Sequence, residues 1–208
     1  MTTPVHDTNI SSHADGIRPL GTENHREAAR IITDALLDDP GWLAVGPKRT
    51  AHRRFVAERY HRAAVAVTAR YGGPIYGAFR DNGLAGVAVT FAPGAYPPPR
   101  STEARYVLSF LAAGPGPIVR GLKTGEVQDG GHPQDPHVYL WFLAVDPRSQ
   151  RSGIGRALLA RVFEDADAPV YLDTSNPDNV PYYASAGFQE IGRGMLPRAT
   201  PMWFMRRP

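Results

Sequence analysis

The stretch Leu143–Leu159, LAVDPRSQRSGIGRALL, carries the strongest fold signal in the chain. An apolar segment ends at Val145, a turn with two glycines follows, and an amphipathic pattern begins at Ile154. Glycines let a backbone approach a ligand closely and expose consecutive N–H groups, and the positive end of a helix dipole adds to them. The order of strand, glycine turn and helix therefore predicts a cradle for a phosphate or a pyrophosphate.

Two arginines of this turn, Arg151 and Arg156, can add charge-assisted hydrogen bonds to a phosphate. By itself, such a turn also fits an ordinary loop with solvated arginines. The chain lacks the Gly-x-x-x-x-Gly-Lys-Ser/Thr pattern of P-loop proteins. It also lacks the early Gly-x-Gly-x-x-Gly run of dinucleotide-binding folds. The predicted cradle therefore belongs to another class of phosphate-binding motif.

Hydrophobic periodicity and breaker residues outline the other elements. Residues 92–100 are rich in proline, and residues 114–136 read as a long loop with at most one short helix near Val119. The order of the expected elements indicates a mixed α/β domain in which strand–helix–strand units come late. Helices are expected at residues 23–37, 50–69, 102–112, 154–165 and 180–186, and strands at 17–20, 74–79, 86–91, 137–145, 170–174, 189–192 and 202–206.

Length and composition narrow the functional class. The 208 residues fit one domain with a tail, and we expect a flexible tail over residues 1–14 and a single domain over residues 15–208. The absence of cysteine excludes disulfides, thiolate zinc sites and a cysteine nucleophile. The net charge of +3 is mild and the arginines are scattered, which argues against a nucleic-acid partner.

The sequence also argues against membrane and metal partners. The first residues lack the apolar core of a signal peptide, and no apolar run approaches the length of a membrane span. We therefore expect a cytoplasmic protein with no membrane partner. The His132–His137 stretch lacks a third well-spaced ligand, so no metal site is expected.

Two motifs taken together resemble the signatures of the GNAT superfamily of N-acyltransferases. Gln150–Gly155, QRSGIG, matches the pattern (Gln/Arg)-x-x-Gly-x-(Gly/Ala), and a second family motif appears as Asn176, Tyr183 and Gly187-Phe188. The clear resemblance covers about residues 138–188. The C-terminal run TPMWFMRRP, residues 200–208, is similar to that of puromycin acetyltransferase-like members.

The resemblance implies an α/β fold of the GNAT type, with a mixed, mostly antiparallel central sheet and helices on both faces. It also implies a splay between the strand ending at Val145 and the strand Val170–Thr174, where acetyl-CoA binds as cosubstrate. The first strand's backbone would hold the pantetheine arm, and the turn would hold the pyrophosphate. The implied cofactor-binding residues are Leu143, Ala144, Val145, Gln150, Arg151, Ser152, Gly153, Ile154, Gly155, Arg156, Asn176 and Tyr183.

The implied reaction is direct attack of an acceptor amine on the thioester. Tyr183 matches the family tyrosine near the sulfur and could give a proton to the leaving thiolate. Many family members carry a glutamate base six positions before the residue that matches Val145, but this chain has Tyr139 there. A glutamate base on this strand is therefore ruled out. His137 is one candidate base, since its intrinsic pKa is suitable, and a water relay assisted by Tyr139 is another.

Some points stay open at this level. Glu103, Glu126 and His132 are further acids or bases whose positions the sequence does not fix. Strand alternation would put His137, Tyr139 and Trp141 on one face, and Val138, Leu140 and Phe142 on the other.

We expect an acetyltransferase that acts on a small-molecule amine, as a monomer or a homodimer. The alternatives are a protein or peptide N-acetyltransferase and a non-catalytic acyl-CoA-binding sensor module.

Overall fold

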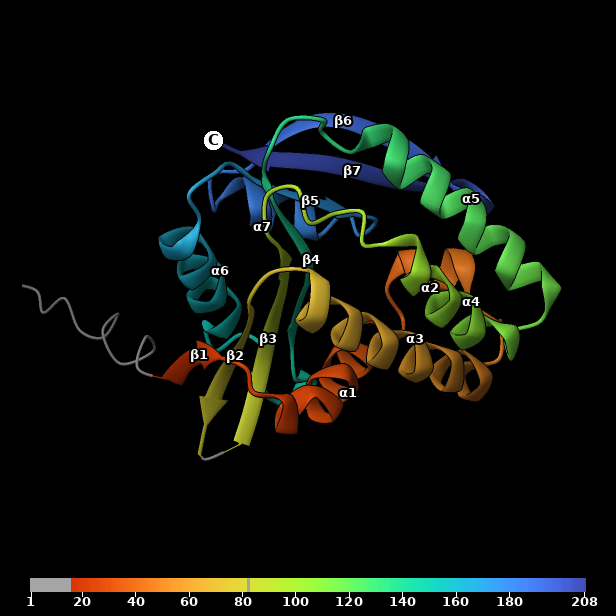
Figure 1. Cartoon of the computed structure of the whole chain (residues 1–208), viewed down its shortest axis with the longest axis horizontal. Coiled ribbons are helices and arrows are strands. Elements are labelled where there is room, and N and C mark those ends of the chain that lie inside the picture. Colours follow the sequence, from red (N-terminus) through yellow and green to blue (C-terminus); the bar gives the residue numbers. More distant parts are fainter. Residues whose placement is uncertain (1–15, 82) are drawn as a thin grey trace, which may run out of the picture.

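The structure is a computed structural model that describes residues 16–81 and 83–208 (Figure 1). The tail expected over residues 1–14 lies outside the described residues. Seven strands form one sheet in the order β1-β2-β3-β4-β5-β7-β6. Only β4 and β5 pair in parallel, and the other neighbours are antiparallel. The strands are β1 Ile17–Pro19, β2 Ile75–Arg80, β3 Gly83–Phe91, β4 Val138–Val145, β5 Val170–Thr174, β6 Gln189–Leu196 and β7 Thr200–Arg207.

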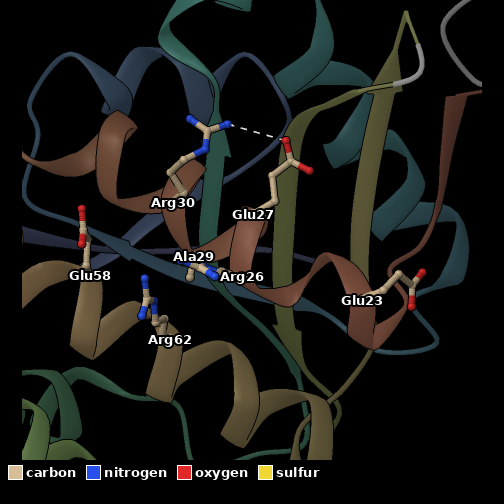
Figure 2. A pocket seen from close by; sticks show the side chains of 7 residues that line it. All are labelled: Glu23, Arg26, Glu27, Ala29, Arg30, Glu58 and Arg62. Carbon is tan, nitrogen blue, oxygen red and sulfur yellow. Dashed lines mark ion pairs between the residues drawn. The ribbon is translucent and has the colours of Figure 1, made fainter.

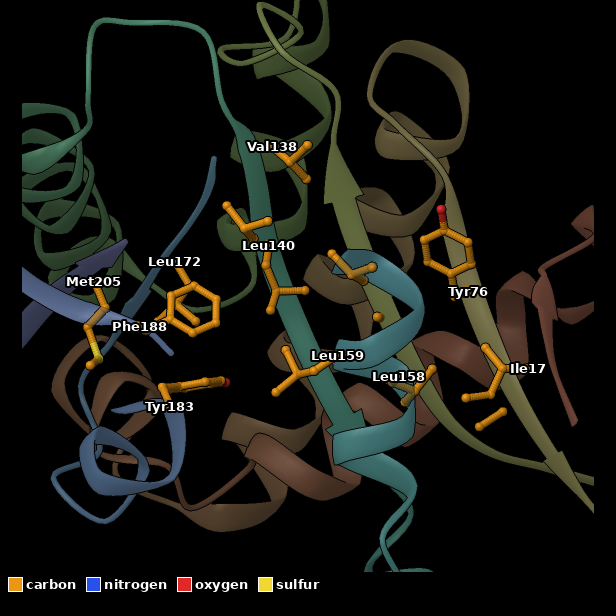
Figure 3. Packing of buried hydrophobic residues seen from close by; sticks show 14 residues of the cluster. Ile17, Tyr76, Val138, Leu140, Leu158, Leu159, Leu172, Tyr183, Phe188 and Met205 are labelled. Carbon is orange, nitrogen blue, oxygen red and sulfur yellow. The ribbon is translucent and has the colours of Figure 1, made fainter. Parts of the chain in front are cut away.

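Helices cover both faces of the sheet. On one face, α6 packs over β1 to β4 through Leu158 and Leu159, and α7 adds Tyr183 to the same buried cluster (Figure 3). On the other face, α1 and α3 bury Ile31 and Val65 against β3 and β4. The predicted GNAT-type fold class is confirmed. The helices are α1 His25–Leu36, α2 Pro40–Val45, α3 Thr50–Tyr71, α4 Glu103–Leu111, α5 Pro115–Gly131, α6 Ile154–Asp165 and α7 Asn179–Ala184.

The strands β4 and β5 separate soon after they meet. They pair only at Val138 with Val170 and at Tyr139 with Tyr171. The rest of β4, through Val145, stays paired with β3 on its other side. The splay expected between these two strands is therefore confirmed, and it leaves one edge of β4 without a neighbouring strand.

A bulge in β4 changes which face its side chains occupy. Thr90 pairs with Leu140 and Val89 pairs with Phe142, so Trp141 is an extra residue in β4. An extra residue shifts the alternation of side chains by one position. Phe142 consequently packs on the α3 side, with its ring 5.4 Å from that of His61. The predicted alternation, which grouped Phe142 with Val138 and Leu140, is wrong at this residue.

The prediction of a long loop over residues 114–136 is wrong, because α5 occupies most of it. Its glycines and prolines are poor helix formers, so tertiary contacts decide the outcome. The guanidinium of Arg120 donates hydrogen bonds to the carbonyl oxygens of Val45 and Gly46 at 3.0 and 3.1 Å. At the other end of α5, a Cβ atom on Gly131 would lie 2.1 Å from the ring of Phe204, so this close contact requires glycine.

The short helix α2 lies between the predicted helices at residues 23–37 and 50–69, where the sequence patterns predict no helix. In the structure Asp39 caps the start of α2, and its carboxylate accepts a hydrogen bond from the Gly41 N–H at 2.9 Å. Proline at the first helical position is compatible with this arrangement. Within residues 16–81 and 83–208, no helix has both the length and the apolar character needed to cross a bilayer.

Candidate active site

A cavity of about 650 Å³ lies beside the free edge of β4. Four segments that are distant in the sequence enclose it: the end of α1 with the residues after it, the end of β4, the glycine turn with the start of α6, and the segment from β5 into α7. Its lining residues are Ala35, Leu36, Asp39, Leu143, Ala144, Val145, Gln150, Arg151, Gly153, Gly155, Arg156, Asn176, Asp178, Asn179, Tyr182 and Tyr183.

The cavity brings together all the sequence-predicted cofactor-binding residues except Ser152 and Ile154. The hydroxyl of Ser152 donates to the carbonyl oxygen of Ser149 at 2.5 Å, so it closes the turn internally. The side chain of Ile154 packs against the core, where a Cβ atom on Gly86 would lie 2.8 Å from it. Both residues therefore stabilise the turn and do not line the cavity.

The turn itself has the conformation of an anion-binding backbone. Gly153 is the N-cap of α6 with φ of 85°, and Arg151 also has a positive φ of 60°. The N–H of Ala157 bonds to the Gly153 carbonyl at 3.0 Å, and the amides before it have no acceptor inside the helix. Such amides, at the positive end of α6, form a site for phosphate oxygens.

Asp146 holds the turn in place. Its buried carboxylate accepts hydrogen bonds from the Arg148 N–H at 3.0 Å and from the Arg148 guanidinium at 3.0 and 2.9 Å. The guanidinium of Arg30, on α1, adds a longer contact at 3.4 Å. The bonds from Arg148 are the main reason that the pKa of Asp146 lies well below its usual range. The carboxylate therefore stays ionised and ties the turn to α1.

Two exposed arginines supply positive charge at the mouth of the cavity. Among the described residues, neither Arg151 nor Arg156 forms an ion pair with a carboxylate. The Arg156 guanidinium donates to the Ser185 hydroxyl at 3.1 Å and lies 5.8 Å from the centre of the Tyr182 ring. Their charges are therefore not balanced by neighbouring carboxylates of the described chain and can act on an anionic ligand.

Tyr183 reaches the cavity from α7 and is otherwise buried in the core. Figure 3 shows its hydroxyl directed toward β4. Burial is the main cause that raises the pKa of this phenol, and Tyr182, Asp39 and Asp173 raise it further. Tyr183 is consequently protonated at neutral pH and can only donate its proton.

Neither the candidate base His137 nor Tyr139, the candidate for assisting a water relay, lines the cavity. His137 precedes β4, at the end opposite to Val145. Its Nδ1 lies 2.7 Å from the carbonyl oxygen of Asp135 and its Nε2 lies 3.0 Å from Nε2 of His132. The buried Tyr139 hydroxyl donates to Asp173 at 2.6 Å, and burial raises its pKa.

Of the two further acids that the sequence left open, Glu126 is not among the residues that line the cavity. Glu126 is exposed on α5, and the side chain of Glu103 lies outside what the structure describes.

Besides the exposed Asp178 at the start of α7, sequence reasoning missed one half-buried carboxylate of the cavity, Asp39. Burial is the main cause that raises its pKa, and hydrogen bonds from the Gly41 amide and the Asn176 side chain oppose this effect. An aspartate followed by proline is a recognisable helix start, so the signal was present. Nothing in the sequence, however, places this cap beside Tyr183.

A second cavity of about 460 Å³ lies between α1 and α3, and none of the motif residues borders it. Acidic and basic side chains alternate around it, and Glu27 pairs with Arg30 at 3.7 Å (Figure 2). The cavity beside β4 is therefore the better candidate for a site.

The chain is similar to known acetyltransferases. The family described as "Acetyltransferase (GNAT) family" matches residues 48–188, which include the turn and Tyr183. Mycothiol acetyltransferase from Acidothermus cellulolyticus is 33% identical over 86 residues, which cover 38% of this chain and 26% of that protein. The match thus spans about a quarter of that curated relative.

Solved structures share the fold over nearly the whole chain. The structure of histone acetyltransferase HPA2 and related acetyltransferase from Corynebacterium glutamicum superposes with a TM-score of 0.66 at 22% identity, covering 92% of this chain and 94% of that chain. The ribosomal-protein-S18-alanine N-acetyltransferase from Escherichia coli gives 0.55 at 17% identity, covering 92% of each chain. At such identities, the likeness shows the fold alone.

Proposed function

Because the chain belongs to the acetyltransferase (GNAT) family, we propose that it transfers an acetyl group from acetyl-CoA to the amine of a small molecule. The observation that carries this proposal is the cavity itself. It joins the glycine turn, the free edge of β4, Asn176 and Tyr183 in one site, although these lie up to 40 positions apart (from Leu143 to Tyr183) in the sequence.

The residues of the cavity fit the parts of acetyl-CoA. The backbone of Leu143–Val145 has β3 on one side only, so its other edge is free to pair with the pantetheine amides. The turn amides, Arg151 and Arg156 would hold the pyrophosphate. Position 155 needs glycine beside the pyrophosphate, because a Cβ atom there would lie 2.8 Å from the Tyr182 hydroxyl. Bound in this way, acetyl-CoA supplies the thioester at the splay.

The side chains near the splay would then serve the transfer. The protonated phenol of Tyr183 would donate a proton to the departing sulfur. A backbone N–H of β4 near Val145 would donate to the thioester oxygen as charge develops on it. Tyr139 suits a positioning role, because its hydroxyl already donates to Asp173.

A small-molecule acceptor is supported by the C-terminal run Thr200–Pro208, which resembles that of antibiotic-modifying members. The similar proteins include both acceptor classes. One is a mycothiol acetyltransferase, and another is a ribosomal-protein-S18-alanine N-acetyltransferase. The acceptor class is therefore a matter for direct assay.

The test is release of free CoA thiol from acetyl-CoA in the presence of antibiotics, polyamines, amino acids or peptides. The chain has no cysteine, so a thiol reagent reports CoA without background from the protein. We expect release that depends on a small amine. Release with peptides alone would overturn the proposed acceptor class. Binding of acetyl-CoA without release by any amine would favour a sensor module instead.

A further inference from the structure

Four half-buried aromatic side chains lie together on one side of the sheet. They come from four different elements, α2, α3, α4 and β4 (Figure 1). This aromatic cluster consists of Trp42, Tyr60, Phe110 and Trp141. Neither of the two family motifs contains any of these residues, and the proposed transfer step uses none of them.

Tyr60 is at the centre of the aromatic cluster. Its ring centre lies 5.5, 5.4 and 6.3 Å from those of Trp42, Phe110 and Trp141, and the rings of each pair meet edge to face. The rings of Trp42 and Phe110 are parallel within 5° at 6.0 Å. Aromatic rings prefer edge-to-face and offset parallel arrangements, so a further aromatic ring can pack against the cluster in the same way.

The Trp42 ring is fixed in one orientation. Its Nε1–H donates to Nε2 of the fully buried His61 at 3.2 Å, and Nδ1 of His61 lies 2.9 Å from the Thr33 hydroxyl. Burial lowers the pKa of His61 to about 3, so this neighbour is uncharged at neutral pH. The cluster therefore presents an oriented ring that loses little freedom when a ligand binds.

The aromatic cluster and the cavity beside β4 share one face of the sheet. Trp141 packs against the buried residues between the sheet and α1. Ala35, Leu36 and Ala144 belong to the same packing, and they also line the cavity. The cavity therefore reaches the face of the sheet on which Trp141 lies.

Two chain segments join the cavity to the aromatic cluster over short distances. On β4, Trp141 is two residues before the cavity-lining Leu143, which is about 7 Å along a strand. Trp42 is in the first turn of α2, and the N-cap of this helix, Asp39, lines the cavity. The Tyr60 ring contacts both tryptophans. A molecule with its amine in the cavity can therefore reach the cluster through a short chain.

The partial exposure of the four rings favours a ligand site over core packing. Phe91 and Tyr171, which are aromatic residues of the neighbouring strands β3 and β5, are fully buried and belong to the core. The rings of the aromatic cluster are each left partly accessible beside a cavity. Small-molecule sites are lined mainly by apolar and aromatic side chains, and a planar ligand ring would cover these four.

We propose that the aromatic cluster is the acceptor subsite, and that the acceptor is a primary amine joined to an aromatic ring by a short aliphatic chain. This inference rests on the proposed acetyl transfer and names its substrate class. The ring of the acceptor packs against Trp42, Tyr60 and Phe110, and its chain passes Trp141 toward the splay. The cluster has no carboxylate, so a second ammonium group would lose its water there without a counter-charge.

Calorimetric titration of the CoA-saturated protein tests this subsite without turnover. The matched ligands are 2-phenylethylamine and 2-cyclohexylethylamine, which carry the same amine on the same chain and differ only in an aromatic or a saturated ring. We expect 2-phenylethylamine to bind at least about tenfold more tightly. Cadaverine, which has a second ammonium group in place of the ring, should bind more weakly than 2-phenylethylamine.

Two variants each remove one ring of the cluster. Phe110→Leu and Tyr60→Leu should each reduce the preference for 2-phenylethylamine by about three- to tenfold. Phe55→Leu is the matched control, because Phe55 is an exposed aromatic residue of α3 outside the cluster, and this variant should keep the preference. In turnover of 2-phenylethylamine, Phe110→Leu should mainly raise KM. All three variants should still be stabilised by acetyl-CoA, which shows that they fold.

Equal affinity for the two matched ligands, tighter binding of cadaverine, no binding of any of the three, or a preference that survives in both cluster variants would overturn the inference. The proposed function survives these results if acetyl-CoA binds and CoA is released with another small amine. If the wild-type protein fails to bind acetyl-CoA, the proposed function fails, and this inference fails with it.

Discussion

The hydroxyl oxygen of Tyr182 lies so close to Gly155 that a Cβ atom on this glycine would be 2.8 Å away from it. Gly155 belongs to the turn before α6, and Tyr182 belongs to α7, so the two family motifs meet at this point. Both residues line the same cavity. The two motifs, although separate in the sequence, therefore contribute to the same cavity.

Gly155→Val should abolish acetyl-CoA binding, because its side chain would displace Tyr182 and occupy the backbone cradle. The wild-type protein should gain about 2.7 kcal/mol in unfolding free energy at an acetyl-CoA concentration of 100 Kd, and the variant should gain none. Thermal unfolding with and without acetyl-CoA measures the difference. Gly125→Ala is the matched control, since a Cβ atom at this α5 position meets nothing within 4 Å. Normal stabilisation of the Gly155 variant would exclude the cradle.

Tyr183→Phe should reduce kcat by about 10- to 100-fold and leave acetyl-CoA affinity nearly unchanged. The variant removes the proton donor and keeps the aromatic ring that packs 5.7 Å from Phe188. Steady-state kinetics and calorimetry together separate the two effects. Tyr182→Phe removes the neighbouring hydroxyl and should have the smaller effect on kcat. If Tyr183→Phe keeps full turnover, another group protonates the sulfur.

Asp146→Asn should destabilise the protein at neutral pH by about 1–2 kcal/mol, because it weakens the bonds to Arg148 and Arg30. The folded-state pKa of Asp146 is depressed, so its contribution is present above the ordinary aspartate value of about 3.9 and is lost as the pH falls below it. Urea unfolding at pH 7 and pH 3 measures this. If the variant and the wild type differ in unfolding free energy by the same amount at both pH values, the depressed pKa of Asp146 is contradicted.

His61 should make stability fall on mild acidification. It is fully buried, and burial lowers its pKa to about 3. Its Nδ1 lies 2.9 Å from the Thr33 hydroxyl, and its Nε2 accepts from Trp42 Nε1 at 3.2 Å, which requires an unprotonated Nε2. The unfolded histidine takes up a proton near pH 6.5, so the folded state loses up to about 1.4 kcal/mol per pH unit below that value.

Chemical unfolding between pH 7 and pH 5 measures this slope. His132, whose pKa is lowered to about 4 mainly by burial, adds to it. His61→Gln should reduce the number of protons taken up on unfolding by about one, and the contribution of His132 to the slope should remain. A slope that does not change in the variant would show that His61 is not held neutral by the fold.

The sequence was sufficient for the parts of the fold that have local signals. The glycine turn, the strand before it and α6 follow from periodicity and from Gly153, whose left-handed φ of 85° suits glycine. The splay followed from the family resemblance, because no local pattern in Val170–Thr174 indicates where β5 leaves β4.

Other parts depend on contacts that the sequence does not display. The helix α5 is stabilised by the fit of Gly131 against Phe204 and by the bonds of Arg120 to residues 45 and 46. The bulge at Trp141 shifts Phe142 to the α3 side. Asp39 is brought into the cavity that Tyr183 lines only by the packing of the start of α2 on the end of β5.

The central claim is that the turn before α6 holds the pyrophosphate of acetyl-CoA. Calorimetric titration of the wild-type protein with acetyl-CoA and with S-acetylpantetheine, which lacks the pyrophosphate, tests it most directly. We expect one acetyl-CoA per chain, with S-acetylpantetheine bound at least about 100-fold more weakly. Equal affinity for the two ligands, or no binding of acetyl-CoA, would contradict it.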